Sequence, residues 1–263
     1  MPNVIITALI NSVLFFASTP PDHKIFTVPG QHRSSQEITE RLTPTIHAWY
    51  DDKGARNMVL NGLVDAFITH LGRREAQHYL SQCKKPPLAV FDIDETVLSA
   101  YQSLKKNTAE TTSYARASAI DAMEPLQPLQ RLYTFLLASG VQVVFVSARS
   151  NSTSLRTKII QKLTSSGYPI FVDVLLYSAS GKTTNAQWKE SVRNALAGKY
   201  TIVATIDDDW RNLQGNNVGR WALWVPGCIL TIPREQQFYA QLVTASTNKT
   251  FAVAARDYNT AHA

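Results

Sequence analysis

The sequence predicts an α/β fold in which helices cover a Rossmann-like, doubly wound parallel sheet. The first observation is a set of short, β-branched and almost entirely apolar runs, typical of strands buried on both faces: 88–91, 141–146, 170–176 and 201–206. The second is that stretches with helical periodicity separate these runs: 126–138, 152–163 and 186–196. Strands that alternate with helices favour a parallel sheet with helices on both faces.

The regions around these runs predict the domain organisation. Helical periodicity in residues 21–86 indicates an N-terminal helical segment before a core at 87–233, in which residues 221–225 are expected to add a fifth strand. Residues 100–124 carry no strand signal and are interpreted as a small insertion that caps the functional site. Residues 234–263 are expected to form a closing helix and a tail.

The N-terminus holds an apolar run at residues 4–16. It is too short for a convincing membrane span, which needs about 20 residues, but it has the length of a signal-peptide hydrophobic region. No Lys or Arg precedes it and no A-x-A site follows it. Two interpretations therefore stay open. Residues 1–20 are a signal peptide of a secreted or periplasmic protein, or they are a buried first element of a cytoplasmic one.

Composition describes a globular chain with a sizeable core. Of its 263 residues, 44% are hydrophobic and 17% are charged, which excludes a disordered protein. The formal net charge is +6, but the basic residues are scattered, so a solvated surface is favoured over a nucleic-acid partner. Two cysteines, Cys83 and Cys228, exclude a disulfide framework and a cysteine zinc cage, and whether they pair stays open.

An apolar strand runs directly into the acidic residues Asp92 and Asp94. Residues i and i+2 of an extended segment point the same way, so both carboxylates are expected at the carboxyl end of the strand, where open α/β sheets bind ligands. Adjacent carboxylates repel unless a cation or proton intervenes, and Mg²⁺ prefers hard oxygen ligands. The alternative, an acidic helix N-terminus favoured by the helix dipole, accounts for Glu95 but not for Asp-x-Asp.

The string around these residues, FDIDETVLS, resembles the first motif, D-x-D-x-T, of the haloacid-dehalogenase (HAD) superfamily. Within that superfamily it is similar to bacterial secreted class B and class C acid phosphatases and to plant vegetative-storage acid phosphatases. The resemblance extends over residues 88–233 and implies a HAD core with a small cap.

Two further motifs of these phosphatases follow in order. Ser147 ends the next predicted core strand, where its hydroxyl can donate to a phosphoryl oxygen. Lys189 lies in WKESVR, which resembles the family stretch Y-K-S-x-x-R, and its ammonium is expected to stabilise the transferring phosphoryl group. The alternatives are an ordinary turn serine and an exposed helix lysine.

The fourth motif departs from the family pattern at two positions. The stretch DDDWRNL resembles G-D-x-W-x-D-L, and Trp210 and Leu213 fix the register. Asp208 then matches the metal-binding aspartate, Asp207 replaces the glycine, and Asn212 replaces the second acid. Asn212 leaves the metal site one charge poorer. Asp207 either adds an acid behind the ligands or competes with Asp208 as the ligand.

The resemblance implies a Mg²⁺-dependent acid phosphatase that hydrolyses small phosphomonoesters through an aspartyl-phosphate intermediate. Mg²⁺ is expected to be held by Asp92, the backbone carbonyl of Asp94, and Asp208. Asp92 is the nucleophile, and Asp94 protonates the leaving oxygen and then activates water. Ser147 and Lys189 are expected to bind the transferring group.

Thr96, Arg149 and Tyr101 are the candidate substrate-binding residues. An aromatic ring such as Tyr101 or Trp210 can stack on a base, which makes a nucleoside monophosphate one candidate substrate, with core packing as the alternative. No nucleic-acid partner and no stable membrane span are expected. Two other functions stay open: a phosphotransferase with an alcohol acceptor, and a non-catalytic binding or storage protein. The presence of the candidate nucleophile Asp92 argues against the second.

Overall fold

The computed structural model describes residues 50, 55–102, 119–178 and 183–225. The chain divides into two units: Met1–Leu63 with Gly227–Val253, and Val64–Pro226 with Ala254–Ala263. In the first unit, the described residues are Tyr50 and the first half of helix α3 (Ala55–Leu71), where the Arg56 guanidinium lies 4.3 Å from the centre of the Tyr50 ring. The second unit contains the sheet.

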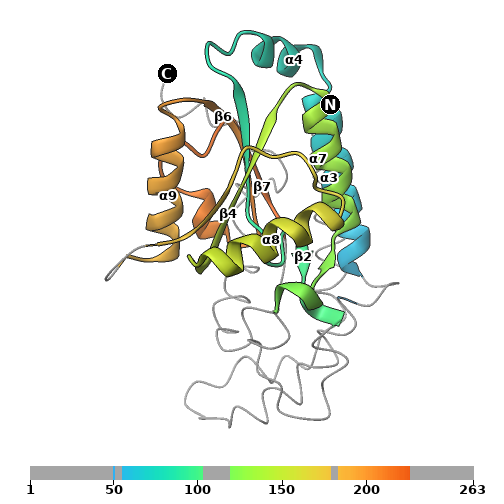
Figure 1. The fold of residues 1–263 in the computed structure, drawn as a ribbon. Coiled ribbons are helices and arrows are strands. Elements are labelled where there is room, and N and C mark those ends of the chain that lie inside the picture. Colours follow the sequence, from blue (N-terminus) through green and yellow to red (C-terminus); the bar gives the residue numbers. More distant parts are fainter. Residues whose placement is uncertain (1–49, 51–54, 103–118, 179–182, 226–263) are drawn as a thin grey trace, which may run out of the picture. The chain divides into compact units, whose positions relative to one another are not determined.

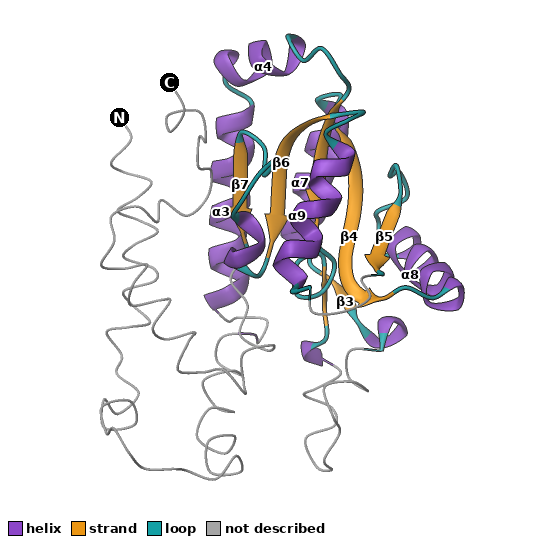
Figure 2. Ribbon diagram, turned by 90° about the vertical axis from the view of Figure 1, so that its left-hand side faces the viewer, coloured by secondary structure: helices purple, strands orange, loops and turns teal. Residues whose placement is uncertain are grey.

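A five-stranded parallel sheet forms the centre of the second unit and confirms the predicted fold class. Its strands are β1 (Pro87–Phe91), β4 (Gln142–Ser150), β5 (Val174–Tyr177), β6 (Thr201–Asp207) and β7 (Trp221–Trp224). Their order is β5-β4-β1-β6-β7, and every neighbouring pair is parallel (Figures 1 and 2). Because β4 and β5 lie on one side of β1 and β6 and β7 on the other, the winding direction reverses beside β1. Such a reversal is where doubly wound sheets bind ligands.

Helices cover both faces of this sheet (Figure 1). Helix α9 (Asn185–Leu196) lies on one face, and α7 (Gln127–Ala138) and the second half of α3 lie on the other. Helix α8 (Thr153–Ser165) connects β4 to β5, and α4 (Arg74–Ser81) follows α3. The predicted connecting helices are therefore confirmed. A capping box between Thr184 and Gln187 begins α9 and fixes the start of the helix that carries Lys189.

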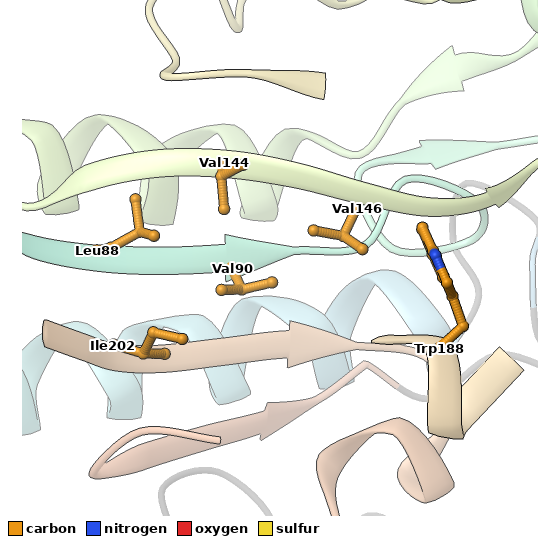
Figure 3. Packing of buried hydrophobic residues seen from close by; sticks show 6 residues of the cluster. All are labelled: Leu88, Val90, Val144, Val146, Trp188 and Ile202. Carbon is orange, nitrogen blue, oxygen red and sulfur yellow. The ribbon is translucent and has the colours of Figure 1, made fainter. Parts of the chain in front are cut away.

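Alternate residues of the central strands pack on opposite faces, as the period of two requires. On the α9 face they form a buried cluster with one helix side chain (Figure 3): Leu88, Val90, Val144, Val146, Ile202 and Trp188. On the other face, the ring of Phe145 lies 6.0 Å from Phe91 and 5.8 Å from Tyr168 between centroids. Tyr168 in turn meets Tyr133 of α7 at 5.1 Å. Both faces of β1 are thus buried, which explains its uninterrupted apolar sequence.

Side chains of α3 and α4 cover the β7 edge of the sheet. The indole of Trp221 is almost fully buried, and its Nε1 donates to Nε2 of His70 at 3.0 Å. Its ring meets Tyr79 edge-on at 5.3 Å. These contacts hold Trp221 of the edge strand β7 against both helices.

The structure differs from the sequence prediction at two places. The expected strand at 170–176 begins only at Val174, because the Tyr133 hydroxyl donates to the Ile170 carbonyl and accepts from the Ile170 amide, both at 2.7 Å. Ile170 is consequently exposed rather than buried. The second difference is a pair of short antiparallel strands, β2 (Leu98–Ser99) and β3 (Glu124–Pro125), at the two ends of the expected insertion.

Several expectations lie outside the described residues: the signal peptide, most of the insertion, the closing helix at 234–263, and Cys228. The 3-10 turns η2 (Ile120–Ala122) and η3 (Trp210–Leu213) complete the described elements. Within the described ranges, no helix combines the length and the apolar character that a membrane crossing needs.

Gly219 is predicted to be a position where a side chain is not tolerated. Its φ is +96°, and an added Cβ would lie 2.7 Å from the Val203 carbonyl carbon and 2.8 Å from the Ala204 nitrogen, which are backbone atoms of β6. We expect Gly219→Ala to lower the free energy of unfolding by about 1–3 kcal/mol, measured by urea denaturation. Gly62→Ala is the matched control. Nothing lies within 4 Å of its added Cβ, so that helical change should be neutral or stabilising by up to about 1 kcal/mol. Equal effects of the two substitutions would contradict the prediction.

Candidate active site

The candidate site begins where β1 ends, beside the point at which the winding of the sheet reverses. Asp92 directly follows β1, and its backbone amide donates to the Ile206 carbonyl at 2.9 Å, which continues the pairing with β6. Its side chain is 5% exposed. The apolar strand therefore carries a buried carboxylate to the carboxyl edge of the sheet.

A tight turn follows Asp92 and contains Asp94. The amides of Val97 and Leu98 both donate to the carbonyl of Ile93, at 3.1 and 3.0 Å. Glu95 adopts a positive φ of 57° in this turn, and its buried carboxylate accepts from the Ala100 amide at 2.7 Å. The turn is thus held by its own backbone and by one buried acid.

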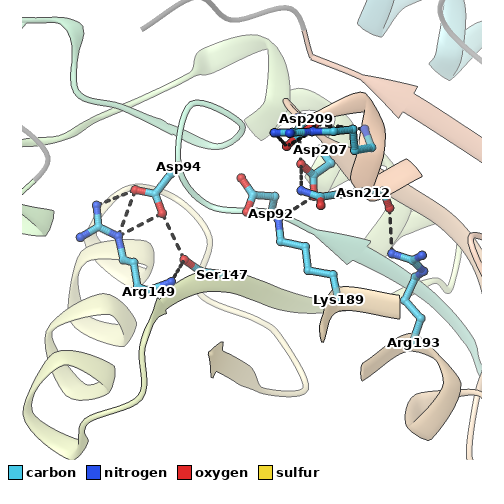
Figure 4. Close-up of polar contacts among 10 residues, drawn as sticks. Asp92, Asp94, Ser147, Arg149, Lys189, Arg193, Asp207, Asp209 and Asn212 are labelled. Atoms are coloured by element: carbon cyan, nitrogen blue, oxygen red, sulfur yellow. Dashed lines mark hydrogen bonds and ion pairs between the residues drawn. The ribbon is translucent and has the colours of Figure 1, made fainter. Parts of the chain in front are cut away.

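Asp94 turns its carboxylate toward the end of β4 (Figure 4). The Arg149 guanidinium binds it through two nitrogens, with Nη2 at 2.5 Å from Oδ1 and Nε at 3.0 Å from both oxygens. The Ser147 hydroxyl donates to Oδ2 at 3.1 Å. The structure therefore brings together three expected site residues from the first and second motifs.

Lys189 lies on the opposite side of the site, between two carboxylates. Its Nζ is 2.6 Å from Oδ1 of Asp92 and 2.7 Å from Oδ2 of Asp207 (Figure 4). All three side chains are at most 6% exposed. The pairing of Lys189 with Asp92 agrees with the expected proximity of lysine and nucleophile, and the contact with Asp207 is an additional finding.

Helix α9 also fixes the loop that follows β6. Arg193 is four residues after Lys189, hence on the same helix face, and it is 1% exposed. Its guanidinium donates to the carbonyls of Asn212 at 2.8 Å and Gln214 at 2.7 Å. One helix therefore positions both the ammonium and the loop of the fourth motif. Arg193 ends the stretch WKESVR, and its i, i+4 spacing from Lys189 is the sequence signal that could have indicated this role.

The carboxylates of Asp92, Asp207 and Asp208 converge, and a ligand oxygen from each lies within 4.8 Å of the others. The Oδ2 atom of Asp92 is buried and has no hydrogen-bond partner among the described residues. Hard carboxylate oxygens with an unsatisfied buried acceptor suit a divalent cation such as Mg²⁺. Asp94 is not a member of this convergent group, so its carboxylate and that of Asp92 have different partners.

The pKa values of the buried aspartates are raised by burial and by neighbouring negative charge. Burial raises the pKa of Asp92 to about 7, with Lys189 opposing the shift and the Asp207 and Asp94 charges adding to it. Burial, together with the charges of Asp92 and Asp207, also raises the pKa of Asp208 well above its ordinary value. Burial alone would lower the pKa of Lys189, but Asp207 and Asp92 outweigh it and raise that pKa. Three carboxylates face one ammonium, so a cation would relieve the excess charge.

The remaining candidates are buried or partly buried. Thr96 is fully buried, and its hydroxyl has no hydrogen-bond partner among the described residues. Tyr101 is 4% exposed, which favours core packing of its ring over stacking on a base. Trp210 is partly buried at the start of η3.

Comparison with protein-family models matches residues 53–251 to the acid phosphatases of HAD superfamily subfamily IIIB. Among solved structures, the class C acid phosphatase from Bacillus anthracis has a TM-score of 0.55 and 19% identity over 80% of this chain and 82% of that chain. The same kind of enzyme from B. anthracis with tungstate bound has a TM-score of 0.53 and 18% identity over 81% of each chain. Comparison with curated proteins gave no match.

The two structural similarities establish the shared fold, and the family match covers most of the chain. The site at the carboxyl edge of the sheet contains the acidic, hydroxyl and lysine side chains of the motifs that carried the resemblance. The chain therefore belongs to the acid phosphatase family of HAD superfamily subfamily IIIB, a family of phosphomonoester hydrolases.

Proposed function

We propose that this protein is a Mg²⁺-dependent acid phosphatase that hydrolyses small phosphomonoesters through an aspartyl-phosphate on Asp92. The observation that carries this proposal is the convergence of three carboxylates with Lys189 at the carboxyl edge of the sheet. Burying charged side chains costs desolvation free energy, so a function explains such a cluster better than fold stability does.

Asp92 and Asp208 are the side chains proposed to hold Mg²⁺, with the backbone carbonyl of Asp94. The buried, unpartnered Oδ2 of Asp92 and the carboxylate of Asp208 are acceptors that a cation can use. When bound, Mg²⁺ neutralises charge on the substrate phosphate and so lets an anionic nucleophile approach it.

The first chemical step belongs to Asp92. Its carboxylate oxygen attacks phosphorus in line, a P–O bond to Asp92 forms, and the bond to the leaving oxygen breaks. The Lys189 ammonium, 2.6 Å from Asp92, holds the nucleophile in place and offsets charge on the phosphoryl oxygens. Because Lys189 sits in a buried site, its charge acts with little screening by water.

Asp94 is proposed to supply the proton for the leaving oxygen. In the second step it takes a proton from water, whose oxygen bonds to phosphorus while the bond to Asp92 breaks, which releases inorganic phosphate and restores the Asp92 carboxylate. Arg149 and Ser147 hold its carboxylate in a fixed orientation. A protonated Asp94 no longer carries the charge that Arg149 pairs with. The guanidinium then becomes available to a phosphate oxygen, which is the substrate-binding role expected for Arg149.

The proposed substrate is a small phosphomonoester. Tungstate is a tetrahedral oxyanion like phosphate, and its presence in a structure with this fold supports phosphate as the recognised group. Thr96 and Tyr101 are both buried, so no direct contact of either side chain with the substrate is proposed.

Asp92→Asn is expected to lower kcat by at least about 10³-fold, because the amide cannot act as the nucleophile. The assay is release of a chromogenic alcohol from its phosphate ester at saturating Mg²⁺. Asp65→Asn is the matched control, since Asp65 pairs with Arg131 on the surface and should leave kcat unchanged. A circular dichroism melt checks that both variants are folded. Substantial turnover by folded Asp92→Asn would exclude the aspartyl-phosphate mechanism.

Removal of Mg²⁺ with EDTA is expected to abolish turnover, and added Mg²⁺ should restore it. Binding to the native state alone should also stabilise the fold by about 2.7 kcal/mol at 100 times Kd, which raises Tm by several degrees. Asp208→Asn should lose most of this Tm increase. Full activity in excess chelator, or an unchanged Mg²⁺ effect on Tm in Asp208→Asn, would refute the metal assignment.

A further inference from the structure

Asp207 occupies a position where the family motif has glycine, yet it makes the second contact of the buried lysine. Oδ2 of Asp207 lies 2.7 Å from Nζ of Lys189, and the side chain of Asp207 is 2% exposed. An ammonium has three N–H donors. Asp92 and Asp207 take two of them, which leaves one without a partner among the described residues.

The other oxygen of Asp207 is also occupied by protein donors. Its Oδ1 accepts from Nδ2 of Asn212 at 2.9 Å and from the backbone amide of Asp209 at 3.0 Å. Asp92, by contrast, keeps a buried oxygen that has no partner among the described residues. Both oxygens of Asp207 therefore accept from protein donors, which fits a residue that orients Lys189. The unpartnered oxygen of Asp92 is the one that can bind a cation.

The two departures from the motif lie against each other in space. Positions 207 and 212 carry glycine and aspartate in the pattern G-D-x-W-x-D-L, but aspartate and asparagine here. The side chains of Asp207 and Asn212 are joined by a 2.9 Å hydrogen bond. Asn212 therefore contacts the oxygen of Asp207 that Lys189 does not use, and it can act on the lysine through Asp207.

We infer that this chain positions its buried lysine through the acid that stands in place of the motif glycine. Asp207 is the positioning residue that holds Lys189 against Asp92, and Asn212 is the amide that fixes Asp207. This inference rests on the proposed function, because it concerns how Lys189 is held beside the proposed nucleophile Asp92.

An amide at position 212 is a requirement of this arrangement. An aspartate there would remove the N–H that Oδ1 of Asp207 accepts and would place a second carboxylate against it. Arg193 holds the Asn212 carbonyl at 2.8 Å, so the backbone of this position cannot readily move away. The arrangement therefore needs an acid at position 207 and a donor at position 212.

The test is a cycle of substitutions at these two positions: Asp207→Gly, Asn212→Asp, and the double variant that restores the family pattern. Each single change is expected to lower kcat for a chromogenic phosphomonoester by about 10–100-fold, as loss of an orienting partner typically does. KM should change less than kcat, because Lys189 is misplaced chiefly for the charge that develops in the transition state. The double variant should lose less kcat than the product of the two single losses, since the contact between positions 207 and 212 is already absent in Asp207→Gly.

Two further variants make the cycle decisive. Asp207→Asn keeps the shape of the side chain but removes its charge, so it should be folded and lose kcat like Asp207→Gly. Asp65→Asn is the control, because it makes the same charge change in a surface side chain that pairs with Arg131, and it should leave kcat unchanged. A normal kcat in Asp207→Asn, or fully multiplicative losses of kcat in the double variant, would overturn the inference.

Unfolding measurements separate this inference from the proposed function. The contacts of Asp207 with Lys189 and Asn212 exist without turnover. Urea denaturation of the four forms should therefore show that the double variant is more stable than the sum of the single changes predicts. If the native protein hydrolyses no phosphomonoester, the proposed function fails, and a non-additive stability cycle still supports the coupling of positions 207 and 212. Additive changes in stability would overturn that coupling even in an active enzyme.

Discussion

The buried ammonium of Lys189 between the carboxylates of Asp92 and Asp207 is the contact on which the site depends. It joins three elements that are distant in sequence: the end of β1, the first half of α9 and the end of β6. Removing charged groups from water costs several kcal/mol per ion, and only close pairing offsets this cost. The pair is therefore weak evidence for stability and stronger evidence for function, because well-packed apolar residues could fill the same space at lower cost. Its geometry requires the parallel register of β1 and β6, which places both strand ends at the same edge of the sheet.

The site separates into two polar groups, one around each aspartate. Asp92 belongs to the group with Lys189 and Asp207, and Asp94 to the group with Arg149 and Ser147. The two aspartates thus have different partners for the two tasks of the proposed reaction, which are attack on phosphorus by Asp92 and proton transfer by Asp94. The tight turn that contains Asp94 has Glu95 at positive φ and is held by backbone hydrogen bonds. Environment rather than residue type thus distinguishes the two aspartates.

Much of the fold followed from the pattern of apolar residues. The run from Leu88 to Phe91 is apolar at every position because both faces of β1 are covered, and this signal needs no knowledge of the neighbours. The prediction was less accurate at 170–176, where the Tyr133 hydroxyl on α7 captures the backbone of Ile170 and delays the strand to Val174. An apolar composition identifies a strand, but a single side-chain contact from another element sets its boundary.

The sequence by itself determined that Asp92 ends a buried strand, that a hydroxyl and a lysine follow in the order of a phosphatase motif set, and that the motif ending in Leu213 has two unusual positions. These are local properties, fixed by the order and spacing of residues along the chain. Only the tertiary structure decided which groups meet: that Asp94 pairs with Arg149, that Arg193 holds the Asn212 carbonyl, and that Asp207 rather than Asn212 is the second partner of Lys189. The physical reason is that an ion pair depends on distances of a few ångströms between side chains from different elements, and strand register and helix placement set those distances.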